Sequence, residues 1–287
     1  MDLCNLSVIK SVMADAGITF RKEFGQNFLT NRIIPEEIAE QCADDSESMI
    51  LEIGPGIGCL TAELASRYAK VVAVEIDKGL IPVLDKTLAE FDNVTVINDD
   101  VMKIDLRALI EEHSEGRAVS VCANLPYYIT TPILMMLLES GINFRTITVM
   151  VQNEVATRLV APPGNSEYGA ITAMLGYYGT VRKLFKVSAG CFVPAPKVDS
   201  AVIRIDLYRE PKYKPKDERL MRNLIKAAFE MRRKTLQNAI SSKLPAYSKE
   251  EIKTAILSLG YPEAVRGERL STEDFVKLSD ALADLRS

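Results

Sequence analysis

The sequence contains no tryptophan, one histidine and five cysteines in 287 residues. The cysteines are scattered singly and are odd in number, which argues against a disulfide framework and is typical of a reducing cytoplasm. The one histidine, His113, lies in a polar segment without a cluster of Cys or His residues around it. We therefore expect a solvated loop residue there, no bound metal and no histidine-dependent nucleophilic triad.

Long hydrophobic runs are also missing. No stretch approaches the ~20 apolar residues that span a bilayer. The longest, residues 129–138, contains two Thr and a Pro and predicts the start of a buried helix. The N-terminus carries Asp2 and lacks the basic-then-apolar pattern of an export signal. With 47% hydrophobic and 26% charged residues, the composition is that of a soluble globular protein, which we expect in the cytoplasm.

The net charge of −4 conceals an uneven distribution. Residues 181–243 contain 16 Lys and Arg against 6 Asp and Glu, so the rest of the chain carries the acidic excess. A basic segment on an acidic body can hold a polyanion at one place. A merely solvated helical surface would give the same pattern.

Short β-branched runs alternate with helical patterns in the first two thirds of the chain. This alternation predicts an α/β fold with a mainly parallel sheet covered by helices on both faces. The last two candidate strands follow each other without a clear helix between them, so an antiparallel pair could close one edge. The predicted strands are residues 49–53, 70–74, 94–97, 119–123, 146–151, 181–187 and 201–207.

A charged segment with two prolines, residues 208–216, interrupts this pattern and predicts a linker. Helical periodicity follows, with Ser248 and Ser271 as candidate N-caps and Gly260 as a helix stop. We therefore predict two domains, residues 1–207 and a small helical domain of residues 208–287. The predicted helices of the second domain are residues 218–229, 235–242, 249–259 and 272–285.

A glycine loop follows the first predicted strand and opens a helix, in the segment Glu-Ile-Gly-Pro-Gly-Ile-Gly of residues 52–58. Gly54 and Gly56 permit unusual backbone angles and the close approach of a ligand. Glu75 ends the next strand and could accept hydrogen bonds from both hydroxyls of a ribose. Asp100 follows the third strand and could accept from an adenine amine. Because parallel strands end at one sheet edge, these residues predict a nucleoside-cofactor site.

The acidic residue before the glycines favours one cofactor. A dinucleotide places its pyrophosphate on a G-x-G-x-x-G loop, whereas this loop is G-x-G-x-G, and Glu52 would repel a pyrophosphate. S-adenosylmethionine, an amino-acid-bearing nucleoside with a cationic centre, suits that carboxylate better than NAD does. A Glu52 carboxylate that only ties down loop amides is compatible with either cofactor.

The tetrapeptide Asn-Leu-Pro-Tyr of residues 124–127 directly follows the fourth predicted strand. The Asn124 side-chain oxygen and the Leu125 carbonyl could accept both hydrogens of an exocyclic base amine and so localise its lone pair for methylation. Tyr127 offers a ring on which the base could stack, a contact worth ~1–3 kcal/mol. For the tetrapeptide alone, an Asn-Pro turn beside a core tyrosine is the alternative. Phe192, between two proline-rich stretches, could form the other face of an aromatic sandwich or could be a core residue.

Together these motifs resemble the ribosomal small-subunit adenine dimethyltransferase family (the KsgA type). The resemblance implies a Rossmann-like class I methyltransferase domain with an N-terminal helical extension, followed by the helical domain. It covers nearly the whole chain, through residues 22–29, 52–58, 75–77, 124–127, 192–200 and 232–236.

The resemblance also implies an activity. Two methyl groups would be transferred to N6 of each of two adjacent adenines near the 3′ end of small-subunit rRNA, within a pre-ribosomal particle. Gln26 and Asn27 would help to close over the cofactor, and Phe192 would stack on the target base. We also assign Leu29, Ile76, Val101 and Asn124 to the cofactor site.

Three alternatives stay open. A related macrolide-resistance methyltransferase modifies an adenine of large-subunit rRNA, although the helical tail and Leu125 argue against it. The second alternative is a non-enzymatic assembly checkpoint that binds immature small subunits. The third alternative is an NAD-dependent oxidoreductase. We expect a monomer without membrane contact. The residues expected to contact RNA are Arg222, Lys226, Arg232, Arg233 and Lys234.

Overall fold

The computed structural model describes residues 1–18 and 26–286. The chain divides into two compact units. The first, here called the sheet unit, comprises residues 1–156 and 182–207. The second, the helical unit, comprises residues 157–181 and the chain from 208 onward.

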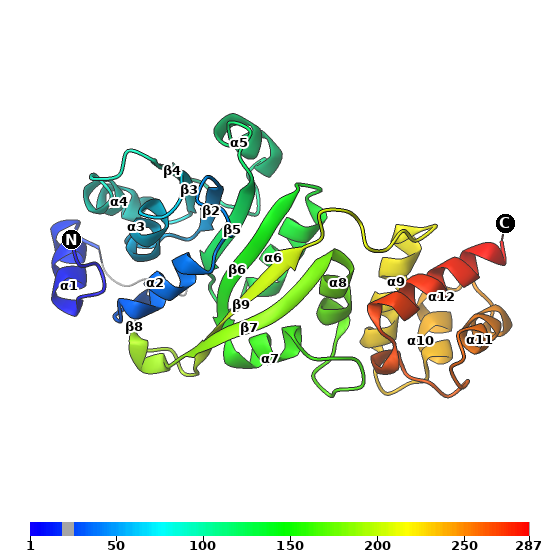
Figure 1. The fold of residues 1–287 in the computed structure, drawn as a ribbon. Helices are drawn as coiled ribbons and strands as arrows, with labels where there is room; N and C mark the ends of the chain where they lie inside the picture. The colour runs from blue at the N-terminus through cyan, green and yellow to red at the C-terminus, as the bar shows by residue number, and fades with distance from the viewer. Residues whose placement is uncertain (19–25, 287) are drawn as a thin grey trace. The chain divides into compact units, whose positions relative to one another are not determined.

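A seven-stranded sheet is the centre of the sheet unit (Figure 1). Its strand order is β4-β3-β2-β5-β6-β9-β7. The strands from β4 to β6 pair in parallel, and β9 pairs with β6 in the antiparallel direction. The predicted closing pair is therefore found as β9 and β7 at one edge. The strand bounds are β2 Met49–Ile53, β3 Lys70–Glu75, β4 Val94–Asn98, β5 Val119–Asn124, β6 Phe144–Gln152, β7 Gly179–Val187 and β9 Ser200–Leu207.

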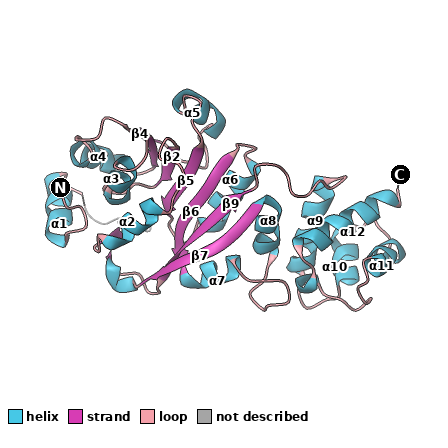
Figure 2. Ribbon diagram, viewed as in Figure 1, coloured by secondary structure: helices cyan, strands magenta, loops and turns pink. Residues whose placement is uncertain are grey.

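The central strands are buried along almost their whole length, as expected for parallel strands covered on both faces. All five residues of β2 are buried, including Glu52. Figure 2 shows the helices flanking these strands. The helices of the sheet unit are α1 Leu6–Asp15, α2 Ile33–Glu40, α3 Cys59–Ala65, α4 Ile81–Thr87, α5 Leu106–His113 and α6 Thr130–Glu139, and α7 Asn153–Leu159 begins in it.

A second, two-stranded sheet joins distant parts of the sheet unit. Strand β1, Phe28–Leu29, pairs antiparallel with β8, Phe192–Val193. Leu29 lies opposite Phe192 in this pairing. The β1 segment is thereby attached to the chain that precedes β9, which fixes residues 26–29 above the main sheet's carboxyl edge.

The helical unit contains α8 Ala170–Tyr178, α9 Glu218–Glu230, α10 Leu236–Lys243, α11 Lys249–Ser258 and α12 Thr272–Asp284. Both predicted serine caps are confirmed, since Ser248 and Ser271 each form a capping box. Gly260 has φ +81° and directly follows Leu259, the C-cap of α11, which confirms the predicted helix stop. None of the helices in the described residues is long and apolar enough to cross a membrane.

Two expectations need correction. Residues 157–181 group with the helical unit, although we predicted them in the first domain. Contacts with the helical unit explain this, because Thr272 Oγ1 donates to the Ala173 backbone carbonyl at 2.8 Å and Tyr168 packs edge-on against Phe229. His113 is the last residue of α5, with a side chain only 18% exposed, and not a solvated loop residue.

Gly267 provides a test of the packing in the helical unit. A Cβ added there would lie 2.6 Å from the Ala228 Cβ and 3.3 Å from its backbone. We expect Gly267→Ala to lower the free energy of unfolding by about 1–3 kcal/mol, because the added methyl overpacks the contact with α9. Chemical denaturation measures this loss.

The matched control removes the opposing methyl. In an Ala228→Gly background, Gly267→Ala should cost clearly less than in the wild-type background. An equal cost in both backgrounds would show that the contact is not the cause.

Candidate active site

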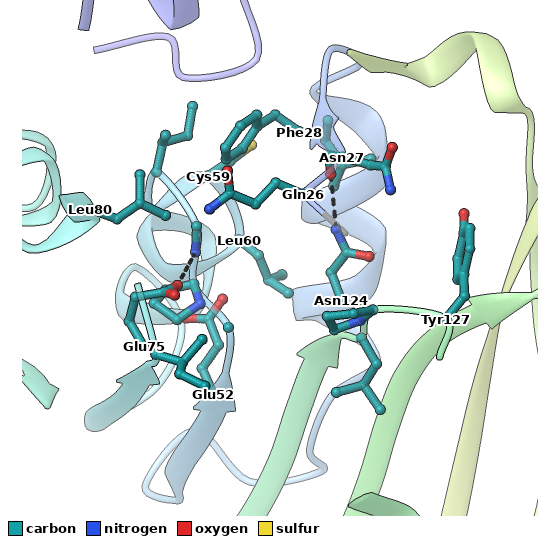
Figure 3. Close-up of a pocket in the computed structure, with 18 residues that line it drawn as sticks. Gln26, Asn27, Phe28, Glu52, Cys59, Leu60, Glu75, Leu80, Asn124 and Tyr127 are labelled. Atoms are coloured by element: carbon teal, nitrogen blue, oxygen red, sulfur yellow. Dashed lines mark hydrogen bonds between the residues drawn. The ribbon is translucent and has the colours of Figure 1, made fainter. Parts of the chain in front are cut away.

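A pocket opens at the edge where β2, β3 and β5 end (Figure 3). The glycine loop after β2, the end of β3, the tetrapeptide after β5 and the segment before β1 form its walls. This is the edge at which open parallel sheets bind ligands. Of the residues predicted for the cofactor, those lining it are Gln26, Asn27, Leu29, Glu52, Gly54, Gly56, Glu75, Ile76 and Asn124.

The glycine loop has the backbone that only glycine adopts easily. Gly54 and Gly56 have φ +73° and +62°. A Cβ at Gly54 would meet no atom within 4 Å, whereas one at Gly56 would lie 3.2 Å from the Phe28 ring. The loop therefore needs glycine for its conformation, and at Gly54 it leaves space open for a ligand.

The Glu75 carboxylate holds this loop against the end of β3. Its Oε2 accepts from the Gly56 N–H at 3.1 Å and its Oε1 from the Asp77 N–H at 2.8 Å. Burial raises the pKa of Glu75, and these backbone donors oppose the rise. Each oxygen has a second lone pair, so the carboxylate can also accept from a ligand hydroxyl.

Glu52 is the most exceptional group in the pocket. Its carboxyl is buried, and Oε2 has no hydrogen-bond partner in the described part of the chain. Burial, with repulsion from Glu75, raises the pKa of Glu52 to about 8. The Thr61 hydroxyl lies near enough to favour the charged form of Glu52, but it forms no hydrogen bond of normal geometry. An unpaired buried carboxyl of this kind is suited to a cationic ligand group.

The segment before β1 joins the two sides of the pocket. Gln26 Nε2 donates to Asp77 Oδ2 at 2.9 Å, and Asn124 Nδ2 donates to the Asn27 carbonyl at 3.4 Å. Gln26 and Asn27 therefore link the end of β3 with the end of β5, and their closing over a cofactor stays a prediction. Residues 22–25, the first part of the matching segment 22–29, lie outside the described residues.

The bond to Asn27 also orients the Asn124 amide. Because a carbonyl must face a donor, the NH₂ group lies on that side and the side-chain oxygen is left as an acceptor. Figure 3 shows this oxygen turned toward the side where Tyr127 stands. The Leu125 N–H continues the sheet by donating to the Met150 carbonyl at 3.3 Å, and the Leu125 side chain is buried.

Tyr127 is anchored at its far end. Its hydroxyl shares a hydrogen bond of 2.7 Å with the Ser200 hydroxyl at the start of β9. Burial raises the pKa of Tyr127, and the bond to Ser200 opposes the rise. The ring lines the pocket beside Asn124. A ring fixed at both ends is a suitable platform for a planar base.

Three predicted site residues do not line this pocket. Asp100 Oδ1 accepts from the Met102 N–H at 3.0 Å, and Oδ2 pairs with Lys103 at 3.2 Å. Val101 is buried beside it. Phe192 is 5% exposed and packs in the core with residues that include Leu29, and its stacking on a target base stays a prediction. The contributions of Asp100 and Val101 to the cofactor site stay predictions.

The structure adds Asp77, which sequence reasoning did not assign to the site. It is buried, accepts from Gln26, and caps a 3₁₀ turn through the Gly79 N–H at 3.0 Å. Its position two residues after Glu75 was the available signal. Ser200 was missed because nothing in its sequence context pointed to Tyr127.

The basic residues predicted for RNA contact differ in their surroundings. Lys226, Arg233 and Lys234 are exposed. Arg232 donates to the Ser166 carbonyl at 2.7 Å and lies 3.5 Å from Glu268. Arg222 is half-buried, pairs with Glu218 and bonds the Tyr178 hydroxyl. Arg222 therefore has a clear role within the helical unit.

The fold and the site together define a class I methyltransferase. The features that define it are the antiparallel strand β9 next to the edge strand, the acidic residue before the glycine loop, and the carboxylate that ends β3. Among the described residues, no group of three His, Cys, Asp or Glu side chains could hold a metal ion.

Comparison with known proteins identifies the family. The sequence pattern of the ribosomal RNA adenine dimethylases matches residues 17–284, and the chain belongs to this family. It is 46% identical over 266 residues to ribosomal RNA small subunit methyltransferase A of Lachnoclostridium phytofermentans, covering 92% of this chain and 91% of the relative. The protein of that name from Alkaliphilus metalliredigens is 44% identical over 277 residues, covering 96% of each chain.

Two solved structures share the fold. A dimethyladenosine transferase from Plasmodium falciparum gives a TM-score of 0.75 at 26% identity, covering 87% of this chain and 95% of that chain. The 23S rRNA methyltransferase ErmE gives a TM-score of 0.71, also at 26% identity, covering 90% of this chain and 100% of that chain. The present protein is accordingly a methyltransferase.

The raised pKa of Glu52 predicts a pH effect on stability. Between its ordinary pKa of 4.5 and about 8, the folded protein keeps a proton that the unfolded chain releases. The contribution of Glu52 to stability therefore falls as pH rises through this window. Glu52→Gln removes that dependence. The free energy of unfolding of the variant should therefore rise relative to that of the wild type between pH 5 and pH 8.5. Urea denaturation at both pH values measures the difference.

The contributions of other titrating groups to the free energy of unfolding cancel when the two proteins are compared at the same pH. A buried glutamine without hydrogen-bond partners changes the free energy of unfolding of the variant by the same amount at all pH values. A stability difference that stays the same at pH 5 and pH 8.5 would mean that Glu52 is ionised in the folded protein throughout.

Proposed function

We propose that this methyltransferase uses S-adenosylmethionine to dimethylate N6 of two adjacent adenines near the 3′ end of small-subunit rRNA. The observation that carries the proposal is the pair of acceptors at the end of β5. The Asn124 side-chain oxygen is left open by the bond to Asn27, and the Leu125 carbonyl follows in the same turn. Tyr127 lies beside them at the pocket.

The pocket fits this cofactor on three counts. The unpartnered carboxyl of Glu52 suits the ammonium of the methionyl part. The Glu75 carboxylate has lone pairs left for ribose hydroxyls, beside the open space at Gly54. Ile76 is 50% exposed at the pocket wall, an apolar surface for a flat adenine ring. A dinucleotide fits less well, since its pyrophosphate would lie near two buried carboxyls.

When bound, the cofactor supplies an electrophilic methyl group. The chain's own residues prepare the acceptor amine, whose lone pair is normally delocalised into the base. Asn124 and Leu125 each accept one of its hydrogens, which favours a tetrahedral nitrogen with a localised lone pair. Tyr127 holds the base plane. No strong base is required, because the methylated amine is acidic enough to lose its proton to water. Alignment of the reacting atoms can supply ~7–11 kcal/mol.

The choice of small-subunit rRNA rests on the relatives. Those 42–46% identical are named for the small subunit. ErmE, named for 23S rRNA, has a similar fold at 26% identity. The shared fold therefore does not separate the two substrates, and the sequence supports the small subunit. We propose that the protein acts as a monomer in the cytoplasm on a pre-ribosomal particle, where binding can also serve as an assembly checkpoint.

Asn124 provides the test of the chemistry. Asn124→Ala should lower the rate of methyl transfer by ~10²–10³-fold, similar to the loss of one transition-state hydrogen bond elsewhere, and should keep the affinity for small subunits. Asn124→Asp retains an acceptor oxygen and should be faster than the alanine variant. Single-turnover transfer of labelled methyl groups, with a separate filter-binding assay, measures both properties. Full activity of the alanine variant would refute the role of Asn124.

The exposed cations of the helical unit provide a test of RNA binding. Arg233→Ala combined with Lys234→Ala should weaken binding to small subunits. The slope of log binding constant against log salt concentration should become shallower by about one to two, because each phosphate contact contributes ~0.7 to that slope on single strands.

A control of equal charge change is available in the same unit. Lys253 and Lys277 pair with Glu263 at 2.9 Å and Glu273 at 2.7 Å. Replacing both by alanine should leave the slope unchanged. If the two double variants have the same slope, residues 233 and 234 do not contact phosphate.

A further inference from the structure

Two cysteines far apart in the sequence meet beside the pocket. The Sγ atoms of Cys4 and Cys59 are 2.7 Å apart, and both residues are free thiols. A disulfide holds its sulfurs at about 2.05 Å, so the two sulfurs lie within about 0.7 Å of bonding distance. The scattered spacing of the cysteines gave no indication of this pair.

The pair connects two elements that border the pocket. Cys4 precedes α1, and Cys59 is the first residue of α3, directly after the glycine loop. Cys59 also lines the pocket, near Phe28 and Gln26 (Figure 3). From α1, the side chains of Ile9, Val12 and Met13 pack in one cluster with three pocket residues, Phe28, Ile57 and Leu80. A bond between the two cysteines would therefore fix α1 to the wall of the pocket.

Small oxidants have a route to these sulfurs. Cys4 and Cys59 line a surface hollow together with Arg32, Glu63 and Phe91. Cys4 is 6% exposed and Cys59 is partly buried, whereas Cys42 and Cys122 have no exposed surface. A thiol oxidant that enters from solvent should therefore reach the Cys4–Cys59 pair first.

We propose that Cys4 and Cys59 form a reversible disulfide that locks α1 onto the glycine loop and slows exchange of the bound cofactor. With a peroxide as oxidant, one sulfur loses two electrons and becomes a sulfenic acid with release of water. The other thiol attacks that sulfur, the S–S bond forms, and a second water leaves. A dithiol reductant restores both thiols. Such reversible bonds are the kind found in reducing compartments.

The surroundings of Cys59 affect the rate of this reaction. The Cys4 thiol, burial, and the carboxyls of Glu52 and Glu63 all raise the pKa of the Cys59 thiol. Cys59 therefore stays protonated at neutral pH, and its reaction with an oxidant is slow, since the thiolate is the reactive form.

Bond formation is tested on the full-length protein, treated with hydrogen peroxide or diamide and digested without reduction. The expected product is a linked peptide pair containing Cys4 and Cys59, with the number of thiols titrated in denaturant falling from five to three and returning to five with dithiothreitol. Cys191→Ser, which removes another partly accessible cysteine, should leave the linked pair in place. Retention of all five thiols, or a linked pair joining Cys42 and Cys122, would overturn the proposal.

The locking effect rests on the proposed cofactor and has its own measurement. Dissociation of labelled S-adenosylmethionine should be several-fold slower from the oxidised protein than from the reduced protein, and Cys4→Ser should show no difference between the two treatments. An unchanged dissociation rate in protein shown to carry the bond would overturn the lock. If S-adenosylmethionine does not bind the reduced protein either, the proposed function fails, while the peptide map still decides whether the bond exists.

Discussion

The hydrogen bond from the Gly56 N–H to the buried Glu75 carboxylate connects the parts on which the pocket depends. It joins the loop after β2 to the end of β3. Gly54 and Gly56 keep their left-handed conformation within that constraint. Because β2 pairs in parallel with both β3 and β5, the same edge also carries Asn124, so that a cofactor loop and an amine-binding turn lie on one rigid frame.

The electrostatics of the pocket follow from this frame. Glu52 and Glu75 are two buried carboxyls in one cavity, and burial raises the pKa of both. Without a ligand, the site therefore favours a protonated Glu52, at a cost to stability that grows with pH. A cationic ligand group reverses that preference, which couples binding to ionisation of Glu52. The anchored Tyr127 and Asn124 need no such coupling, since neutral hydrogen bonds hold them in position.

Much of this arrangement could be predicted from local sequence. The β-branched runs predicted all seven strands of the main sheet to within a few residues, and the positions of Glu75 and Asn124 at strand ends placed them at one edge. Contacts between distant segments could not be predicted. Residues 157–181 join the helical unit through Thr272 and Phe229, Phe192 is covered by the core, and Cys4 meets Cys59. Each depends on side chains far away in the chain, which periodicity does not record.

We infer that this methyltransferase modifies adenines of the small ribosomal subunit. The most direct measurement is reconstituted methylation of separate, unmodified small and large subunits with labelled S-adenosylmethionine, followed by mass mapping of the modified nucleotides. We expect N6,N6-dimethyladenine at two adjacent positions near the 3′ end of small-subunit rRNA and no label in the large subunit. Methylation of large-subunit rRNA alone would contradict it.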